Sequence, residues 1–210
     1  MNKEIVLSPE ELYFMGRYLQ AKFIDYAYVA AMSDIKQNFA LFEKETRNSL
    51  VAAGILMEDF SGNLEVDQQV ANLLKPIFFG EVETSIDVCK LGDPNTVSVY
   101  KFHFYDGITT MVTGCEGKLL IKAIDQLGIK SMVEDLLPAG YNATAEIITE
   151  ATEQSVTRFI AVKSILVGKT AVVKTYIEAD SVFYQECEEY IESVSKEMFI
   201  SDVYAIVKGV

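Results

Sequence analysis

Few side chains in this sequence are of types that commonly carry out chemistry, and His103 and Cys115 are the first to weigh. His103 is the only histidine, so it is the only side chain whose unperturbed pKa lies near neutrality. Cys115 sits in the segment Gly114–Gly117, where a thiol nucleophile could be exposed, but its base would have to be His103. Nothing in their spacing requires that the two residues meet. We therefore expect a sheet histidine that contacts a helix or solvent, and an inert thiol.

Two other patterns resemble reactive sites. A run of carboxylates comprises Glu178, Asp180, Glu186, Glu188, Glu189 and Glu192. Paired carboxylates could do acid–base or metal chemistry, but this run has no matching histidines and no Asp-x-Asp loop. A solvated acidic edge that discourages strand pairing is the commoner meaning, and its functional counterpart is a docking surface for a basic partner, with Glu186, Glu188 and Glu189 as candidate contacts. The segment Gly114–Leu119 lacks the spacing of a phosphate loop and leads into a strand, so it is excluded as a nucleotide site.

The elements that position His103 and Cys115 form the centre of the chain. The residues before Asp106 alternate in the period of a strand with one buried face: Tyr100, Phe102 and Phe104 on that face, Lys101, His103 and Tyr105 on the other. Asp106-Gly107 tolerates the positive φ angles of a type I′ turn, and both residues are candidate partner contacts. The runs Ile108–Thr113 and Lys118–Ala123 then complete an antiparallel meander.

The N-terminal third predicts helices. Ser8 caps the first helix, Pro9 occupies its first position, and Glu11 closes a capping box. The segment Phe23–Ala31 favours a short strand or an extended linker. Ser33 is expected to cap a longer helix that stops at Gly54.

The next elements are a small hairpin and a third helix. The hairpin spans Ile55–Val66, and Asp67 caps the helix, which Pro76 should kink or end. Helix, hairpin and helix together outline a winged-helix unit, but the segment from Ser33 to Gly80 has seven acidic residues against four basic ones, which excludes a DNA reader. Phe78-Phe79 predicts core packing at a helix–strand corner, with an exposed patch for a partner helix as the alternative.

Strands followed by a helix occur twice along the chain, once on each side of a candidate boundary. A strand at Glu81–Cys89, the meander and a helix at Asp125–Leu137 are followed by a candidate boundary at Pro138–Gly140. The later elements are a helix at Ala143–Glu153, strands at Val156–Val167, Thr170–Ile177 and Ser181–Glu192, and a helix at Ser195–Lys208. The segment Val156–Val167 could instead extend the preceding helix. The predicted fold class is α+β, a single compact domain over 1–210 with pseudo-halves 1–138 and 139–210.

Composition narrows the function classes. The chain has 210 residues, half of them apolar, with 18 basic and 31 acidic residues and a net charge of −13. Such a surface repels phosphate backbones and anionic lipid headgroups, so nucleic acid and membrane surfaces are poor partners. The start MNKEIVLSPEE lacks a signal-peptide core, so we expect a cytoplasmic location. Cys89, Cys115 and Cys187 are far apart and without a CxxC pair, which indicates reduced thiols and no zinc site.

The order of these elements resembles a known family. A capped helix (LSPEELYFMGRYL), a second helix and a G-x-L-x-x-D-like segment (Gly62–Asp67) precede the meander with its aromatic strand and Asp-Gly turn, and a second αβ half follows. This order is similar to the EspG family of cytosolic chaperones of type VII (ESX) secretion systems. It is more closely similar to the Firmicutes relatives typified by EsaE, the chaperone of a secreted nuclease toxin.

The resemblance implies a quasi-two-fold fold, in which a central antiparallel sheet is flanked by two helical bundles, with no catalysis, metal or cofactor. The family binds the helical tip of a secretion substrate, shields its apolar surface and helps to deliver it to the membrane ATPase. In EspG proteins a loop between central strands and the C-terminal helical bundle make that contact. Asp106-Gly107 is too short for a long recognition loop, so no binding residue is transferred.

Three hypotheses follow. The first is a non-enzymatic cytosolic chaperone that binds the helical targeting region of a toxin or of a WxG- or LXG-type protein; a chain this acidic would capture a basic partner quickly and in a salt-dependent way. The second is an immunity protein that occludes a toxin's active site with an acidic surface. The third is an enzyme that uses Cys115 or the acidic run. The first is the prediction tested below.

Overall fold

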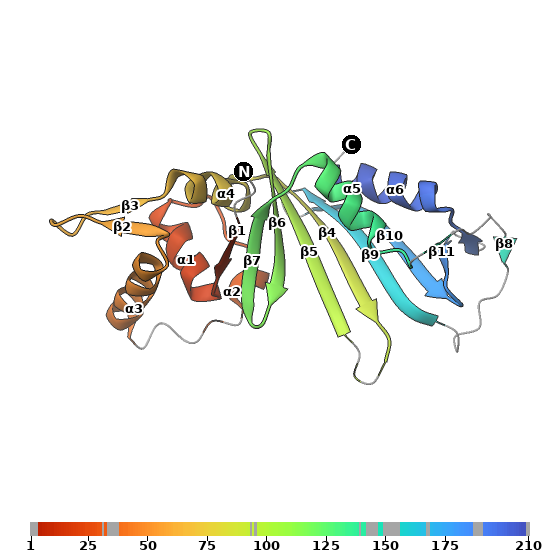
Figure 1. Cartoon of the computed structure of the whole chain (residues 1–210), viewed down its shortest axis with the longest axis horizontal. Coiled ribbons are helices and arrows are strands. Elements are labelled where there is room, and N and C mark those ends of the chain that lie inside the picture. Colours follow the sequence, from red (N-terminus) through yellow and green to blue (C-terminus); the bar gives the residue numbers. More distant parts are fainter. Residues whose placement is uncertain are drawn as a thin grey trace. The chain divides into compact units, whose positions relative to one another are not determined.

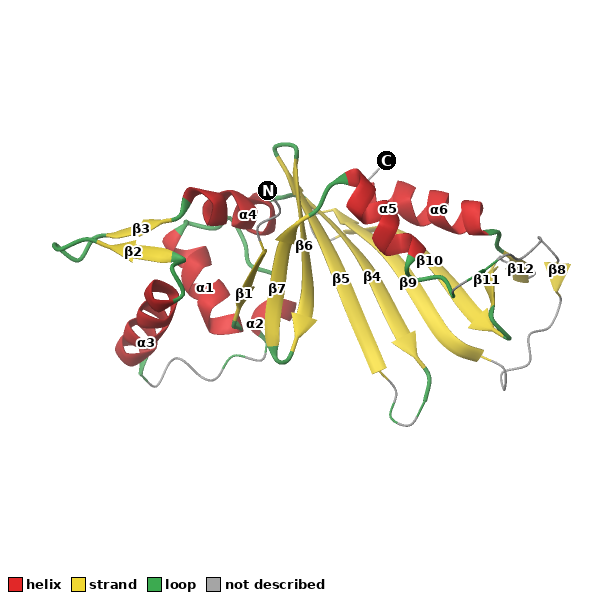
Figure 2. Ribbon diagram, viewed as in Figure 1, coloured by secondary structure: helices red, strands yellow, loops and turns green. Residues whose placement is uncertain are grey.

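The computed structural model describes residues 4–30, 32, 38–92, 94, 96–138, 140–141, 147–148, 156–166, 169–186 and 191–208 (Figure 1). The chain forms two compact units, one of Met1–Gly80 with His103–Ala123, the other of Glu81–Phe102 with Ile124–Val210. The predicted α+β class is confirmed, because helices accompany a large antiparallel sheet that is not closed into a barrel (Figure 2). None of the described helices has the length and apolarity that crossing a bilayer requires.

Among its described residues, the first unit contains four helices and the strand order β1-β7-β6-β5, with a separate hairpin of β2 and β3. Its elements are β1 (Glu4–Leu7), α1 (Pro9–Tyr18), α2 (Tyr26–Val29), α3 (Phe39–Ala52), β2 (Leu56–Glu58), β3 (Leu64–Val66), α4 (Gln68–Phe79), the end of β5 (Thr96–Tyr105), β6 (Ile108–Cys115) and β7 (Lys118–Ala123). Strand β1 was not predicted from the sequence. It pairs with β7, so that Ile5 lies opposite Ile121.

The second unit has the strand order β5-β4-β9-β10-β11-β12-β8 and two helices among its described residues. Its elements are β4 (Val82–Lys90), α5 (Gln126–Glu134), β8 (Ile147–Ile148), β9 (Val156–Leu166), β10 (Lys169–Ala179), β11 (Val182–Glu186), β12 (Ile191–Ser193) and α6 (Lys196–Lys208). The run β4 to β7 ends in α5 and the run β9 to β12 ends in α6. The doubled plan therefore has four strands in each run, whereas the sequence predicted all four in the first run and only three in the second.

The N-terminal helix forms as the sequence predicts. The Ser8 hydroxyl accepts a hydrogen bond from the Glu11 N–H at 3.1 Å, and the Glu11 carboxylate accepts one from the Ser8 N–H at 2.8 Å. Leu7 and Leu12 are both fully buried, as a hydrophobic staple requires.

The next two predictions need correction. The segment Phe23–Ala31 contains the short helix α2, which Asp25 caps by accepting a hydrogen bond from the Ala27 N–H, and not a strand or linker. Helix α3 begins at Phe39 with Asn38 as its cap, while the predicted cap Ser33 lies outside the described residues. Four residues of helix are too few to show a helical period, so no sequence pattern could reveal α2.

Helix α4 continues through Pro76 and ends at Phe79, so Pro76 does not itself end the helix. Proline removes one N–H donor, but it lies in the last turn, and the Gly80 N–H still donates to the Pro76 carbonyl at 3.0 Å. The cap Asp67 is as predicted and accepts from the N–H groups of Gln69 and Val70.

Tight turns connect the strands with the predicted geometry. Asp106 and Gly107 have φ angles of 48° and 73°, and Glu116 and Gly117 have 49° and 78°, the positive values that a type I′ turn requires. Asp180 and Ser181 adopt φ angles of 51° and 65° without a glycine.

The last third confirms some predictions and corrects others. Residues Val156–Leu166 form a strand and not the alternative helix. The predicted single strand Ser181–Glu192 is two strands, β11 and β12. Residues Ile147–Ile148 form strand β8 where a helix was predicted over Ala143–Glu153, and most of that range lies outside the described residues.

Each unit buries its own apolar side chains. The core of the first unit joins residues of β1, α1, α2, α3, α4, β6 and β7, among them Leu7, Met15, Leu50, Leu74, Phe78, Val112 and Ile121. In the second unit, the rings of Tyr176 and Phe199 lie 4.9 Å apart and those of Phe183 and Phe199 5.3 Å apart, all fully buried. Helix α6 is further tied to β4, where the Thr84 hydroxyl donates to the Val207 carbonyl at 3.3 Å.

We predict that Gly80→Ala destabilises the fold. A Cβ at this residue would lie 2.5 Å from the Pro76 carbonyl oxygen and 2.7 Å from that of Phe104, and neither backbone atom can swing away. The free energy of unfolding should fall by about 1–3 kcal/mol, the usual cost of overpacking, in urea denaturation. Gly114→Ala is the matched control, because nothing lies within 4 Å of its Cβ position. Equal effects of the two substitutions would contradict this explanation.

Candidate functional site

His103 is buried and bonded, as the structural interpretation of this residue predicts. Only 2% of its surface is exposed, and its Nε2 lies 2.5 Å from the hydroxyl of Tyr28 on α2. The contact with a helix was predicted. The nearly complete burial was not, because the alternation placed His103 on the face opposite the apolar residues.

Cys115 is exposed at the end of β6. Strands β5 and β6 are joined by a two-residue turn, and His103 and Cys115 differ by five residues in distance from that turn. At roughly 3.3 Å per residue the two side chains are on the order of 15 Å apart along the strands. The structure therefore does not bring the thiol and the imidazole together. Among the described residues, no group of three or more His, Cys, Asp or Glu side chains could hold a metal ion.

The predicted contacts near the meander divide into two groups. Phe78 is completely buried in the core of the first unit, so its ring is not available to a partner, and the core interpretation holds for it. Phe79 is half-buried, and its ring lies 5.9 Å from that of Tyr105. Since Tyr105 precedes the exposed turn Asp106-Gly107, the structure brings Phe79 close to that turn.

The acidic run is not a free strand edge. Strand β11 lies between β10 and β12, and Glu178 on β10 forms a 2.6 Å ion pair with Arg158 on β9. The interpretation as an edge is therefore corrected, because the chain adds β12 and β8 beyond it. Glu186 ends β11, while Glu188 and Glu189 lie outside the described residues.

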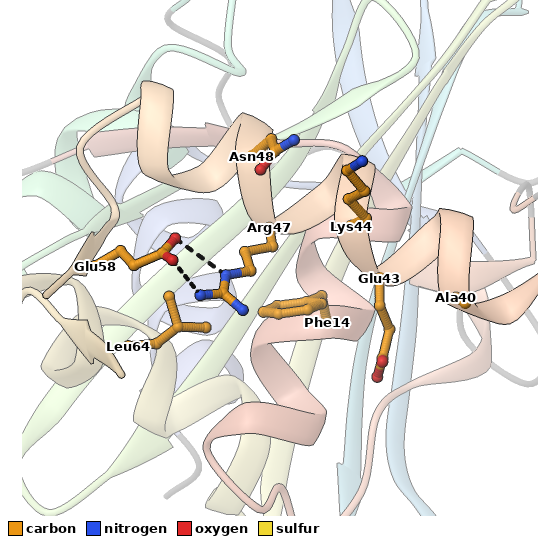
Figure 3. A pocket seen from close by; sticks show the side chains of 8 residues that line it. All are labelled: Phe14, Ala40, Glu43, Lys44, Arg47, Asn48, Glu58 and Leu64. Atoms are coloured by element: carbon orange, nitrogen blue, oxygen red, sulfur yellow. Dashed lines mark hydrogen bonds and ion pairs between the residues drawn. The ribbon is translucent and has the colours of Figure 1, made fainter. Parts of the chain in front are cut away.

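A groove in the first unit gathers side chains from α1, α3 and the β2–β3 hairpin (Figure 3). Its volume is about 520 Å³, and it is lined by Phe14, Ala40, Glu43, Lys44, Arg47, Asn48, Glu58 and Leu64. Helix α3 supplies most of this wall because only Thr46 and Leu50 of the helix are buried. The rest of the helix surface is left for the groove and for solvent.

Two arginines organise the charges of the groove. Arg47 binds Glu58 through both carboxylate oxygens, with Nη2 to Oε1 at 2.5 Å and Nε to Oε2 at 3.2 Å (Figure 3). Its Nη2 also donates to the Gly62 carbonyl at 2.9 Å. Arg17 pairs with Glu43 at 3.0 Å, and its guanidinium lies 4.6 Å from the centre of the Phe39 ring. Each lining carboxylate thus has a cation beside it, which leaves no pair poised to share a proton.

The contacts of Arg47 also hold the hairpin against α3. A second anchor comes from α1, where the Tyr18 hydroxyl donates to the Leu64 carbonyl at 2.6 Å. The groove is therefore a fixed recess of mixed polarity on a protein surface. Such a recess can receive side chains of another protein, and it carries no nucleophile–base arrangement.

Sequence reasoning missed this site. The sequence carries little signal for the Arg47–Glu58 pair, because the two residues are 11 positions apart in different elements, and no periodicity relates a helix residue to a strand residue. The hairpin itself was predicted, but not its contact with α3.

Comparison with known proteins finds similarity at the level of the fold. No family model matches the chain, and no curated protein matches it. Among solved structures, the chain is similar to the type VII secretion system chaperone EspG5 of Mycobacterium tuberculosis, which was solved in complex with the PE25-PPE41 dimer. The TM-score is 0.64 at 10% sequence identity, over 98% of this chain and 96% of that chain. The EspG-like fold is thereby shown.

We predict that Tyr28→Phe destabilises the first unit. The substitution removes the hydroxyl that bonds buried His103 and leaves an imidazole nitrogen without that partner. The free energy of unfolding should fall by about 1–2 kcal/mol. Tyr26→Phe on the same helix, where the side chain is 77% exposed, should change it by less than about 0.5 kcal/mol. A Tyr28→Phe protein as stable as the control would show that this bond contributes nothing.

We also predict that Arg47→Ala loosens the hairpin without unfolding the chain. The pair with Glu58 is partly exposed, so the loss of global stability should stay near 1 kcal/mol or below. Amide hydrogen exchange in residues 58–63 should become faster, because the bonds to Glu58 and Gly62 are lost. Lys44→Ala, an exposed residue on the same helix, is the control. Unchanged exchange after Arg47→Ala would contradict this role.

Proposed function

We propose that the chain is a non-enzymatic chaperone or adaptor that works in the cytoplasm and holds the helical targeting region of a type VII secretion substrate. The observation that carries the proposal is the likeness to EspG5 over nearly the whole length of both chains. A full-length match includes every element that surrounds the groove. Function does not follow from fold alone, so the surface has to fit the role as well.

Three features of the described surface support binding of another protein. The net charge of −13 favours a basic partner and fast, salt-dependent capture. The lining carboxylates of the groove are paired with arginines, which suits a fixed binding surface better than proton transfer. Large apolar side chains such as Tyr26 and Phe60 are well exposed and can meet the apolar face of a helix.

The same proposal extends to the class of substrate and to its delivery. We expect the substrate to be a toxin or a WxG- or LXG-type protein, and its delivery to the ATPase of the secretion system to follow binding. A relation to the Firmicutes chaperones typified by EsaE is part of this expectation.

We predict that the chain forms a stable complex with the helical region of a WxG- or LXG-type protein from its native host. Co-expression followed by size-exclusion chromatography should show co-elution of the two proteins. The apolar face of the substrate helix is exposed to water when the helix is alone, and its burial against this chain is favourable. The dissociation constant should rise roughly tenfold between 50 and 500 mM salt, because complementary charges are screened.

The matched control is the catalytic domain of the same substrate. A chaperone should bind the helical region and leave the catalytic domain free. Absence of any complex, or binding to the catalytic domain alone as an immunity protein would bind, would contradict the proposal.

A further inference from the structure

The tip of the β2–β3 hairpin carries an aromatic side chain that is fully exposed to solvent. Phe60 is fully exposed, whereas no other large apolar side chain in the described part of the chain exceeds 77% exposure. Met57 on β2 of the same hairpin is 53% exposed. An isolated exposed apolar residue is common on protein surfaces, so the exposure of Phe60 indicates a binding site only together with a second observation.

That observation is the rigidity of the tip. The Asp59 carboxylate accepts hydrogen bonds of 2.8 Å from the N–H of Ser61, the N–H of Asn63 and the side-chain amide of Asn63. The Asp59 N–H donates to the Asn63 carbonyl at 3.0 Å, and Gly62 takes the positive φ of 82° that the turn requires. These bonds, with that from the Asn63 side chain foremost, lower the pKa of Asp59 below its usual value.

The strand ends that adjoin the tip are fixed as well. Arg47 on α3 binds Glu58 and the Gly62 carbonyl, and Tyr18 on α1 binds the Leu64 carbonyl. Phe60 is thus carried by a loop whose two sides are bonded to two different helices. A preorganised backbone loses little conformational freedom when a partner covers the side chain that it carries, so more of the burial energy of that side chain appears as affinity.

The charges around the tip define the partner. Exposed Glu65 lies directly across the strands from Met57, and ionised Asp59 adjoins Phe60. Glu58 is already matched by Arg47. An apolar centre bordered by carboxylates is complementary to an apolar surface bordered by lysine or arginine, and the net charge of −13 favours the same partner.

We propose that the β2–β3 hairpin is a docking site for an amphipathic helix of the secretion substrate, with Phe60 inserted into the apolar face of that helix and Glu65 beside its basic border. Met57, which is unbranched and adaptable, is a further exposed apolar side chain on the same hairpin. This inference rests on the proposed function, and it names the surface and the partner chemistry for it.

The test uses the full chain and the helical regions of the WxG- or LXG-type proteins of its native host, with affinity measured by isothermal titration calorimetry. Phe60→Ala should weaken binding at least tenfold, as expected for an aromatic anchor. Leu127→Ala is the matched control, because Leu127 is 77% exposed on α5 of the other unit, and it should change affinity less than about twofold. Thermal unfolding of both variants should match that of the wild type, since neither side chain is in a core.

A second variant tests the charge at the border. Glu65→Gln should weaken binding and reduce the dependence of affinity on salt, because one attraction is lost. If the wild type binds and Phe60→Ala binds equally well, the hairpin proposal is overturned and the proposed function stands. If the wild type binds none of the helical regions, both fall. If Phe60→Ala instead abolishes binding to phosphatidylglycerol vesicles and leaves the helix affinity unchanged, the tip is a membrane contact and the proposal is overturned.

Discussion

The antiparallel pairing of β4 with β9 is the interaction on which the doubled fold depends. Residues Val82 to Lys90 pair in continuous register with Leu166 to Arg158, so that Ile86 faces Val162 and both are fully buried. Each strand is the first of a four-strand run that ends in a helix, and α6 contacts both β4 and β9. The Lys163–Asp87 ion pair of 2.6 Å joins the same two strands on their more exposed face. A shift of one residue in this register would turn the buried side chains toward solvent.

Local chemistry predicted much of this fold. The capping box at Ser8, the Asp-Gly turn and the limits of β7 are visible in the sequence because each rests on residues within a few positions of one another. What could not be predicted depends on distant partners. Strand β1 is a strand because β7 accepts it, and β11 and β12 divide what reads as one β-rich segment. Burial of His103 requires α2, which is itself too short to leave a pattern.

The candidate binding surface likewise has parts that local sequence predicts and parts that depend on distant residues. The hairpin was predicted from its apolar pairs and its turn residues, whereas its fixation by Arg47 and Tyr18 depends on α3 and α1. Phe78 shows the opposite case, since an apolar pair beside a glycine reads equally well as core or as patch, and only packing decides that it is core. A surface that binds proteins needs no special residue types, so composition and spacing cannot distinguish it from other surfaces.

These features together describe a stable body with fixed recesses and exposed apolar side chains, a design suited to holding another chain. The most direct measurement is the secretion of the WxG- or LXG-type protein that binds this chain, followed in the native host when this chain is absent. If the chain is its chaperone, the protein disappears from the culture medium while its transcript persists, and restoring the gene restores secretion. Normal secretion in the absence of the chain would contradict that role.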